Sequence, residues 1–278
     1  MKKEHHNIIL ISCYFGKLPW YTAHFLKSCS YNRDIQFLIF TDDLSYQEAA
    51  PENVQFTYMT LEEFNILATQ KLSFTTRIDH AYKVCDFKPT YGLMFQSEIQ
   101  DYDFWGHIDL DIIFGNIRFY ISNDLLNEFD LIAVRDDFLT GYFLLYRNTD
   151  KLRMMFMQSK DYRRVLSEPK HYCFDETNFC FKEFMHNIHY TKVKSEIESM
   201  THVVMRLHEA GYIKAYFDFH IIEGAYGKLK WNKGRLMYKN KYEVLLYHLI
   251  LFKTIYTPRN IGKISVKDSF RISNTRIY

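Results

Sequence analysis

The sequence is poor in the residues that mark disulfide-rich or turn-rich proteins. Its 278 residues include 10 glycines, 5 prolines and 5 cysteines. The cysteines form no Cys-x-x-Cys pair, and their odd number would leave one without a partner. This pattern argues against a disulfide framework and against a zinc knuckle, and it indicates a reducing compartment.

Long apolar runs and two common catalytic signatures are also missing. The strongest late apolar run, 244–252, is about half as long as a membrane-spanning helix needs to be. The first residues lack the apolar stretch and small-residue cleavage site of a signal peptide. No glycine-rich phosphate loop follows the first predicted strand, and no His-Glu-x-x-His occurs. Because the sequence has neither a membrane-spanning run nor a signal peptide, we expect a cytoplasmic protein that contacts at most the inner face of the cell membrane.

The charge is spread unevenly along an otherwise ordinary composition. Apolar residues make up 47% and charged residues 24%, as in soluble globular proteins. Residues 228–278 carry 12 Lys and Arg against 2 acidic residues, whereas the other residues carry 23 against 31. A basic end on an acidic body favours an anionic partner such as a membrane surface or a diphosphate, or it is a solvated surface. Without a recognised nucleic-acid motif, we predict no nucleic-acid partner.

The first part of the chain has the pattern of a parallel α/β sheet. Residues 7–15 form an apolar run that predicts a buried strand, and 35–40 form a second. Pro19 opens a predicted helix that continues to about residue 30. Sheets of this kind bind ligands beyond the carboxyl ends of their strands, which suits Asp42 for a ribose or base. A strand-terminating turn would explain Asp42 equally well.

Further elements follow along the chain. Thr60 and Glu63 have the spacing of a capping box, which predicts a helix from residue 60. The other predicted strands are 104–108, 131–134 and 142–146, and the other predicted helices are 77–95 with an interruption at 86–89, 150–166 and 176–185. We expect one α/β domain with a mixed sheet flanked by helices, in which residues 1–227 hold the catalytic part and 228–278 form a helical, basic segment that completes the site.

The strongest chemical signal is the pair Asp109 and Asp111. Apolar residues lead into it and follow it, and side chains two apart on a straight strand share a face. Both carboxylates could therefore reach one hard divalent cation such as Mn²⁺ or Mg²⁺, which would neutralise a diphosphate leaving group. The alternative is a pair of structural aspartates held by hydrogen bonds.

Two longer blocks carry a specific resemblance. Residues 82–92 read YKVCDFKPTYG, and residues 102–115 read YDFWGHIDLDIIFG. Together with the first strand and the Asp175 region they resemble a bacterial family, formerly a domain of unknown function, of glycosyltransferase-like proteins associated with capsule, O-antigen or lipopolysaccharide synthesis. The resemblance covers roughly residues 7–185. It implies a GT-A-like, Rossmann-type fold in which an Asp-x-Asp motif holds Mn²⁺ or Mg²⁺ on the donor diphosphate.

The resemblance also implies roles for individual residues. In GT-A enzymes the loop after the first strand faces the base, which here assigns Tyr14 and Phe15 to the nucleotide, with Asp42 on the base or ribose. Donor binding is assigned to a further set, Lys83, Asp86, Lys88 and Gly141. Lysines near a helix interruption suit a phosphate, and glycine admits close approach of a sugar ring. Without the resemblance, both lysines would be ordinary surface residues.

Two acidic residues and a late His-Lys pair complete the candidate site. Asp175 and Glu176 resemble the acidic pair near the acceptor, where one carboxylate deprotonates a hydroxyl; alternatively Asp175 caps a helix. His248 and Lys253 resemble a C-terminal motif in which histidine is a third metal ligand and lysine contacts the diphosphate. A lone histidine in an apolar run is otherwise a core residue.

The sequence thus predicts a metal-dependent glycosyltransferase. It would transfer a sugar from a nucleoside-diphosphate sugar, by analogy a UDP-sugar, to a glycan or lipid-linked hydroxyl. Two alternatives stay open: another metal-dependent nucleotide enzyme such as a nucleotidyltransferase, and a non-catalytic glycan-binding protein.

Overall fold

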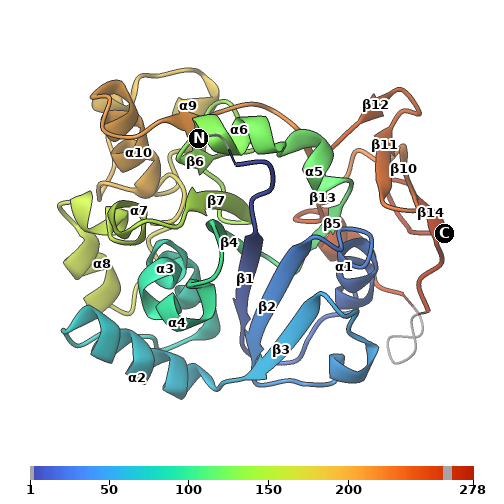
Figure 1. Ribbon diagram of the computed structural model, residues 1–278, viewed down its shortest axis with the longest axis horizontal. Helices are drawn as coiled ribbons and strands as arrows, with labels where there is room; N and C mark the ends of the chain where they lie inside the picture. Colours follow the sequence, from blue (N-terminus) through green and yellow to red (C-terminus); the bar gives the residue numbers. More distant parts are fainter. Residues whose placement is uncertain (1–2, 259–264) are drawn as a thin grey trace.

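A computed structural model describes residues 3–258 and 265–278 of the chain (Figure 1). Its centre is a seven-stranded mixed sheet in the order β3-β2-β1-β4-β7-β6-β8. The strands are β1 (Ile8–Tyr14), β2 (Ile35–Thr41), β3 (Val54–Tyr58), β4 (Phe104–Ile108), β6 (Leu131–Ile132), β7 (Phe143–Arg147) and β8 (Ala215–Tyr216). The predicted mixed α/β architecture is confirmed.

Four neighbouring strands of this sheet run in one direction. β3, β2, β1 and β4 are parallel, and β7 pairs antiparallel with β4. Their carboxyl ends therefore meet at one edge, the lower edge in Figure 1. This is the edge at which parallel α/β sheets bind ligands.

Alternating side chains of β1 explain the layers on the two faces of the sheet. Ile8 and Leu10 belong to the hydrophobic cluster that contains Phe25 of α1 (Thr22–Cys29). Ile9 and Ile11 belong to a second cluster, on the side of α2 (Leu61–Leu72), η2 (Ala81–Thr90), α3 (Tyr91–Met94) and α4 (Gln96–Ile99). Because successive residues of a strand point to opposite faces, one apolar run fills both clusters.

Shorter helices surround the rest of the sheet. They are η1 (Gln47–Ala49), α5 (Ile117–Tyr120), α6 (Asn123–Glu128), α7 (Asp150–Arg153), η3 (Met155–Gln158), α8 (Tyr162–Ser167), α9 (Phe181–Met185), η4 (Tyr190–Lys192) and α10 (Met200–Glu209). In Figure 1 α7, α8 and α10 lie together on the side of the molecule away from α1.

The C-terminal region consists mainly of strands, so the expected helical character of residues 228–278 is wrong. β10 (Leu229–Asn232), β11 (Arg235–Tyr238), β12 (Tyr242–Glu243) and β14 (Ser269–Ile272) form a four-stranded sheet, and α11 (Phe252–Ile255) is a single turn. Buried and more exposed residues alternate along β10 and β14, which is the period of a half-buried strand. The buried side joins the same core as β1 and α1.

A third sheet connects this region to the aspartates. It has the order β5-β13-β9, with β5 (Ile112–Phe114), β13 (Leu246–His248) and β9 (Ile221–Glu223). β13 pairs antiparallel with β5, so that His248 lies opposite Ile112. A strand from the end of the chain is thereby held beside the residue that follows Asp111.

Several local predictions can be compared with the structure. The strands predicted at 7–15, 35–40 and 104–108 are confirmed, as is the capping box between Thr60 and Glu63. The predicted helix 150–166 is broken into α7, η3 and α8, and of the predicted helix 176–185 only α9 forms. Of the predicted helix 77–95, residues 81–90 form a 3₁₀ helix with Pro89 near its end, and residues 91–94 continue it as α3.

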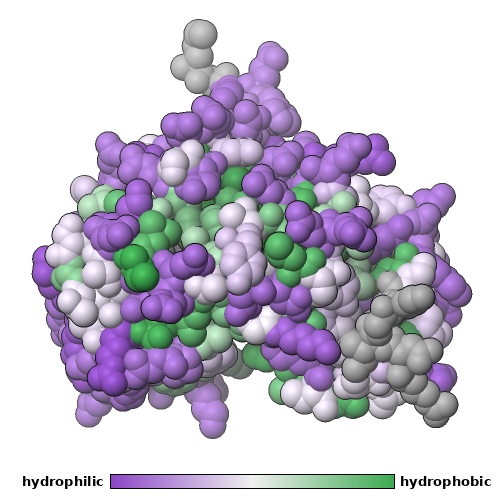
Figure 2. Space-filling view, turned by 90° about the horizontal axis from the view of Figure 1, so that it is seen from below, coloured by the Kyte–Doolittle hydropathy of each residue, from purple (hydrophilic) through white to green (hydrophobic). Residues whose placement is uncertain are grey.

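Figure 2 shows the face onto which the parallel strands point. Hydrophobic side chains reach it only in small, separate groups among hydrophilic ones. Within residues 3–258 and 265–278, no helix has both the length and the apolar character required to cross a bilayer.

Candidate active site

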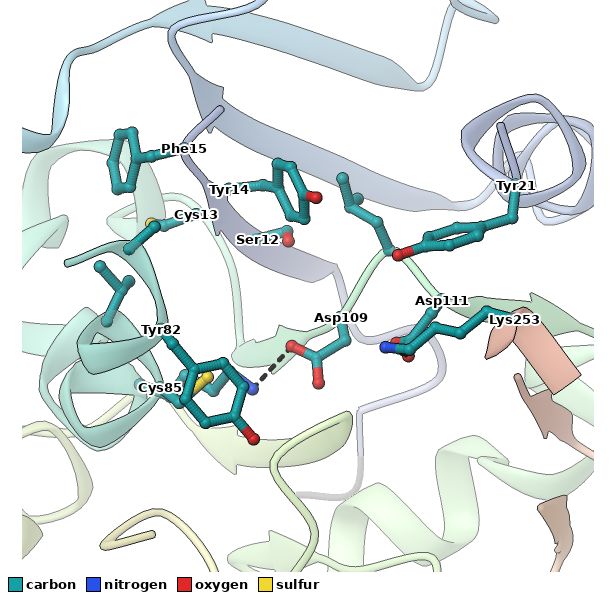
Figure 3. A pocket seen from close by; sticks show the side chains of 14 residues that line it. Ser12, Cys13, Tyr14, Phe15, Tyr21, Tyr82, Cys85, Asp109, Asp111 and Lys253 are labelled. Atoms are coloured by element: carbon teal, nitrogen blue, oxygen red, sulfur yellow. Dashed lines mark hydrogen bonds and ion pairs between the residues drawn. The ribbon is translucent and has the colours of Figure 1, made fainter. Parts of the chain in front are cut away.

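A cavity of about 360 Å³ lies at the carboxyl ends of β1 and β4 (Figure 3). Three tyrosines stand around it: Tyr14 at the end of β1, Tyr21 before α1 and Tyr82 in η2. Both aspartates of the Asp-x-Asp motif line it as well, together with Ser12, Cys13, Phe15, Ala81, Val84, Cys85, Lys88, Leu110 and Lys253. Segments from four distant parts of the sequence therefore share one cavity.

Asp109 and Asp111 lie in the short link between β4 and β5. The Asp109 N–H donates to the Tyr142 carbonyl at 3.2 Å, and the Asp111 carbonyl accepts from the Leu249 N–H at 2.8 Å. Both carboxylates face the cavity in Figure 3. The Asp109 side chain is 35% exposed and that of Asp111 only 7%. The motif is thus fixed through its backbone while its side chains reach the open space.

Asp111 lies between two cationic groups from the C-terminal region. Its Oδ2 accepts from Lys253 Nζ at 2.6 Å and lies 3.3 Å from His248 Nε2. Burial opposes a charge on His248, but the hydrogen bond to Asp111 and the negative charges of Asp111, Glu223 and Asp109 together outweigh it and raise the His248 pKa to about 9. Burial also opposes the Asp111 carboxylate, and His248 and Lys253 nevertheless hold its pKa below the ordinary value.

On the side away from Asp111, His248 contacts a carboxylate and an aromatic ring. Its Nδ1 lies 3.6 Å from Glu223 Oε2, and the Tyr142 ring packs against the imidazole at 4.1 Å between centroids. Glu223 also pairs with Arg135, which forms a forked interaction with Asp137. The orientation of His248 is therefore set by a carboxylate and an aromatic ring.

On the other side of the cavity, Lys88 joins Asp109 to Asp175. Its Nζ lies 2.6 Å from Asp109 Oδ1 and 3.5 Å from Asp175 Oδ2. Burial opposes the ammonium charge, but the negative groups around Lys88, with Asp109 the strongest and Asp175 among them, together raise the Lys88 pKa. Burial raises the pKa of the Asp175 carboxyl well above its usual range, although Lys88 opposes this. Gly141 lies beside the pair, and a Cβ there would overlap the Asp175 carboxylate and lie 3.1 Å from Lys88 Nζ.

Glu176 points to the same glycine. The Gly141 N–H donates to Glu176 Oε1 at 2.6 Å, and burial raises the Glu176 pKa. The residues after Asp175 form a turn, and α9 begins only after Cys180, which offers no side-chain cap. The alternative in which Asp175 caps a helix is therefore wrong.

Lys83 and Asp86 do not line the cavity. Lys83 is fully buried, and its Nζ donates to Asp86 Oδ2 at 2.9 Å and to the carbonyls of Val165 and Lys170 at 2.6 Å each. Asp86 accepts from the N–H groups of Tyr172 and Phe174. The structure therefore gives this pair an internal role, in which it holds the segment before Asp175 against η2.

The residues assigned to the nucleotide differ in position. Tyr14 and Phe15 line the cavity. Asp42 is exposed and accepts from the Gly16 N–H at 2.7 Å, so it supports the loop after β1 without being among the cavity residues. This is the turn role that the sequence left open for Asp42.

Some residues in or beside the cavity had no sequence signal that assigned them to a site. Tyr21 is one tyrosine among 22, and nothing in its neighbourhood distinguishes it; Tyr82 opens the block 82–92, but that block gave it no role. Glu223 lies outside every recognised motif and reaches His248 only through the pairing of β9 with β13. Its position on an apolar strand, as an acid after Ile221 and Ile222, was the one available hint.

The donor set suits a divalent cation bound partly by substrate. Among the described residues no three His, Cys, Asp or Glu side chains are grouped as ligands of one ion. Mg²⁺-type ions are often held by one or two carboxylates while phosphates and water supply the other ligands. The 3.3 Å between Asp111 Oδ2 and His248 Nε2 fits adjacent positions around one ion, which are about 3 Å apart at ordinary metal–ligand distances. Lys253 and Lys88 now hold positive charge against Asp111 and Asp109.

Comparisons with known proteins place the chain in one family. The sequence model of a family described as "Family of unknown function (DUF6625)" matches residues 10–278. The search of curated proteins finds no match. Among solved structures, the galactosyltransferase LgtC in complex with donor and acceptor sugar analogues has 13% identity and a TM-score of 0.35, over 78% of this chain and 75% of that one. Mouse xyloside xylosyltransferase 1 in its apo form has 9% identity and a TM-score of 0.41, over 87% and 97%. Likenesses this distant add nothing about substrate or activity.

Proposed function

The chain belongs to the DUF6625 family of unknown function, and we propose that it is a metal-dependent glycosyltransferase that uses a nucleoside-diphosphate sugar. The observation that carries the proposal is the joint position of Asp109, Asp111 and Lys253 on one cavity walled by tyrosines. Two carboxylates beside a lysine suit a divalent cation together with a diphosphate, and aromatic walls suit a base or a sugar ring. The UDP-sugar is proposed by analogy.

In this proposal Asp109 and Asp111, with His248, hold Mn²⁺ or Mg²⁺ on the donor diphosphate. The ion would supply positive charge that stabilises the departing nucleotide. Lys253 Nζ, already beside Asp111, would add a second positive charge near the same phosphates. Tyr14 and Phe15 would contact the nucleotide, and Lys88 would change partners from Asp109 to the donor.

The acceptor would be a hydroxyl of a glycan or of a lipid-linked saccharide. Asp175 is buried and Glu176 half-buried, and burial raises the pKa of both carboxyls, which makes each a stronger proton acceptor once it is ionised. One of them would take the proton of the acceptor hydroxyl if the reaction inverts configuration. The absence of a side chain at Gly141 lets the Asp175 carboxylate lie close to the backbone there. The same proposal includes a cytoplasmic location, with contact to the inner membrane surface and a role in surface polysaccharide synthesis.

Thermal unfolding with nucleotides tests the donor. The protein is heated with Mn²⁺ alone, with UDP, GDP or CMP alone, and with each nucleotide plus Mn²⁺. We expect one diphosphate nucleotide to raise the melting temperature by several degrees, and only with the metal. Incubation with the matching sugar nucleotide should then give transfer or slow hydrolysis. Turnover of nucleoside triphosphates would instead favour a nucleotidyltransferase, and no nucleotide response would favour a glycan-binding protein.

Variants of the two aspartates link this response to the motif. Asp109→Asn and Asp111→Asn should abolish the shift that needs metal and nucleotide together. Asp101→Asn is the matched control, because Asp101 is exposed and lies outside the cavity. A full response in both Asp109→Asn and Asp111→Asn would reject the proposal.

A further inference from the structure

The four-stranded C-terminal sheet has one apolar face and one basic face. Trp231 and Phe270 on its buried side stack at 5.0 Å, and Tyr31 packs edge-on against Trp231. The Trp231 indole N–H donates to the Phe114 carbonyl at 2.8 Å. Since side chains alternate along a strand, the neighbouring residues of β10 and β14 point the other way.

Those neighbours are cations placed directly opposite one another. Lys230 of β10 is in register with Arg271 of β14. At the end of the hairpin, the Lys239 N–H donates to the Lys228 carbonyl at 2.8 Å, which brings that pair together as well. Like charges directly opposite across strands are destabilising. The pair of Lys230 and Arg271 therefore carries a cost that an anion would remove, and Lys228 and Lys239 add two more positive charges to the same end of the sheet.

A cavity of about 660 Å³ opens between these four cations. No Asp or Glu lines it, and none of the four forms an ion pair with another described residue; its other lining residues are Tyr226, Gly227, Leu229, Asn240, Ile272, Ser273, Asn274 and Tyr278. By contrast Arg235, on the same sheet, is paired with Glu243, and Lys27 nearby is paired with Asp268. The absence of Asp and Glu side chains is thus a property of the cavity and not of the whole sheet.

We propose that this cavity binds the acidic groups of an anionic saccharide, a glycan that carries carboxylate or phosphate. Lys and Arg make short, charge-assisted hydrogen bonds to such groups. Two largely exposed rings, Tyr226 and Tyr278, border the cavity and offer flat surfaces for sugar rings. As an identification of the acceptor class, this inference rests on the proposed function; as a binding site, it does not.

Other anionic partners fit the cavity less well. A bilayer is bound by exposed Leu, Phe or Trp side chains that insert beside the basic ones. No exposed Leu, Phe or Trp lines this cavity: its aliphatic residues Leu229 and Ile272 are buried, and its exposed rings are the more polar tyrosines. A long nucleic acid would also meet the rest of the chain, which carries 31 acidic against 23 basic residues. A short acidic saccharide meets neither obstacle.

Binding of defined oligosaccharides tests the site in the full chain. Calorimetry would use tetragalacturonic acid and pentamannose phosphate, each against its neutral counterpart, methyl-esterified tetragalacturonate and mannopentaose. We expect at least one acidic saccharide to bind at least tenfold more tightly than its neutral form. Lys230→Gln with Arg271→Gln should weaken that binding at least tenfold, without lowering the melting temperature, because a repulsive pair is removed. The control pair, Lys233→Gln with Lys241→Gln, removes the same charge outside the cavity and should change it less than twofold.

Three results would overturn this inference. They are equal affinity for acidic and neutral saccharides, equal loss in the two double variants, and variant-sensitive binding only to phosphatidylglycerol vesicles or to a single-stranded oligonucleotide. The nucleotide and Mn²⁺ response should be intact in Lys230→Gln with Arg271→Gln. Saccharide binding without any nucleotide response would reject the proposed sugar transfer and leave this site standing, whereas the converse would reject this site alone.

Discussion

Lys253 and Asp111 are 142 positions apart in the sequence, and their Nζ and Oδ2 atoms are 2.6 Å apart in the structure. The pairing of β13 with β5 produces this contact, because it places His248 opposite Ile112 and α11 directly beyond it. The cavity at the end of the parallel sheet is therefore closed by the last part of the chain. The Asp-x-Asp motif supplies the two negative side chains of the cavity, and Lys88 and Lys253 supply the two positive ones from elsewhere in the sequence.

We predict that Lys253→Met separates nucleotide binding from metal binding. The variant loses a cation beside the proposed diphosphate position, so affinity for the nucleotide should fall at least tenfold, about 1.4 kcal/mol. Metal binding should persist or tighten, because Lys253 no longer competes for Asp111. Titrations with Mn²⁺ alone and with nucleotide plus Mn²⁺, followed by thermal unfolding, measure the two effects. Lys241→Met, an exposed lysine outside the cavity, should behave as the parent, and equal loss of both responses would contradict the prediction.

Gly141→Ala should remove function at a modest cost in stability. The new Cβ would overlap the Asp175 carboxylate and crowd Lys88. Overpacking of this kind costs about 1–3 kcal/mol. The matched control is Gly211→Ala, where the space is open but φ is +69°, so that only backbone strain of about 1 kcal/mol is added. We expect sugar transfer to fall at least tenfold in Gly141→Ala and to stay unchanged in Gly211→Ala. Activity assays measure the transfer, and urea unfolding of both variants measures the cost in stability.

Lys83→Met distinguishes an internal role of Lys83 from a phosphate-binding one. The substitution leaves Asp86 buried without its ammonium partner, which typically costs about 3–5 kcal/mol. Nucleotide affinity of the protein that remains folded should change less than twofold, because Lys83 does not line the cavity. Lys71→Met, at an exposed position of α2, should alter neither quantity. Parent-like stability together with lost nucleotide binding would restore the interpretation made from the sequence.

His24 should make stability fall in mildly acidic solution. It packs between Trp20 and Phe270, and burial lowers its pKa to about 4 from the ordinary value of 6.5. Below pH 6.5 His24 is protonated in the unfolded chain, whereas in the folded chain it stays neutral down to about pH 4. The unfolded state therefore binds more protons in this window, and the free energy of unfolding decreases as the pH falls through it. Between pH 7 and 5 the loss should be about 2 kcal/mol.

Urea unfolding of the parent and of His24→Gln at both pH values isolates this contribution. Glutamine does not titrate, so the parent should lose about 2 kcal/mol more than the variant over the interval. His5→Gln is the control, because His5 is an exposed histidine far in sequence from His24. Identical pH dependence in the parent and in His24→Gln would show that burial of His24 does not control the acid response.

Local pattern was enough for the parallel half of the sheet and for part of the cavity. The apolar runs of β1, β2 and β4 are specified by their own residues, since strands buried on both faces must be apolar throughout. The Asp-x-Asp pattern assigned Asp109 to a metal and the resemblance assigned Tyr14 to the nucleotide; the two share one cavity because the carboxyl ends of parallel strands meet at one edge of the sheet. The capping box is likewise local, because Thr60 and Glu63 are three positions apart in the sequence.

What the sequence could not supply depends on contacts between distant segments. Lys83 and Lys88 are five positions apart on η2. Lys83 is buried and donates to the carbonyls of Val165 and Lys170, whereas Lys88 lines the cavity. The C-terminal region reads as basic and aromatic, and only the pairing of β10 with β14 places Lys230 opposite Arg271. By itself the sequence determined the strands and the aspartates that follow them. Tertiary structure alone decided which cations meet those aspartates, because charge acts over a few ångströms of space and is indifferent to separation along the chain.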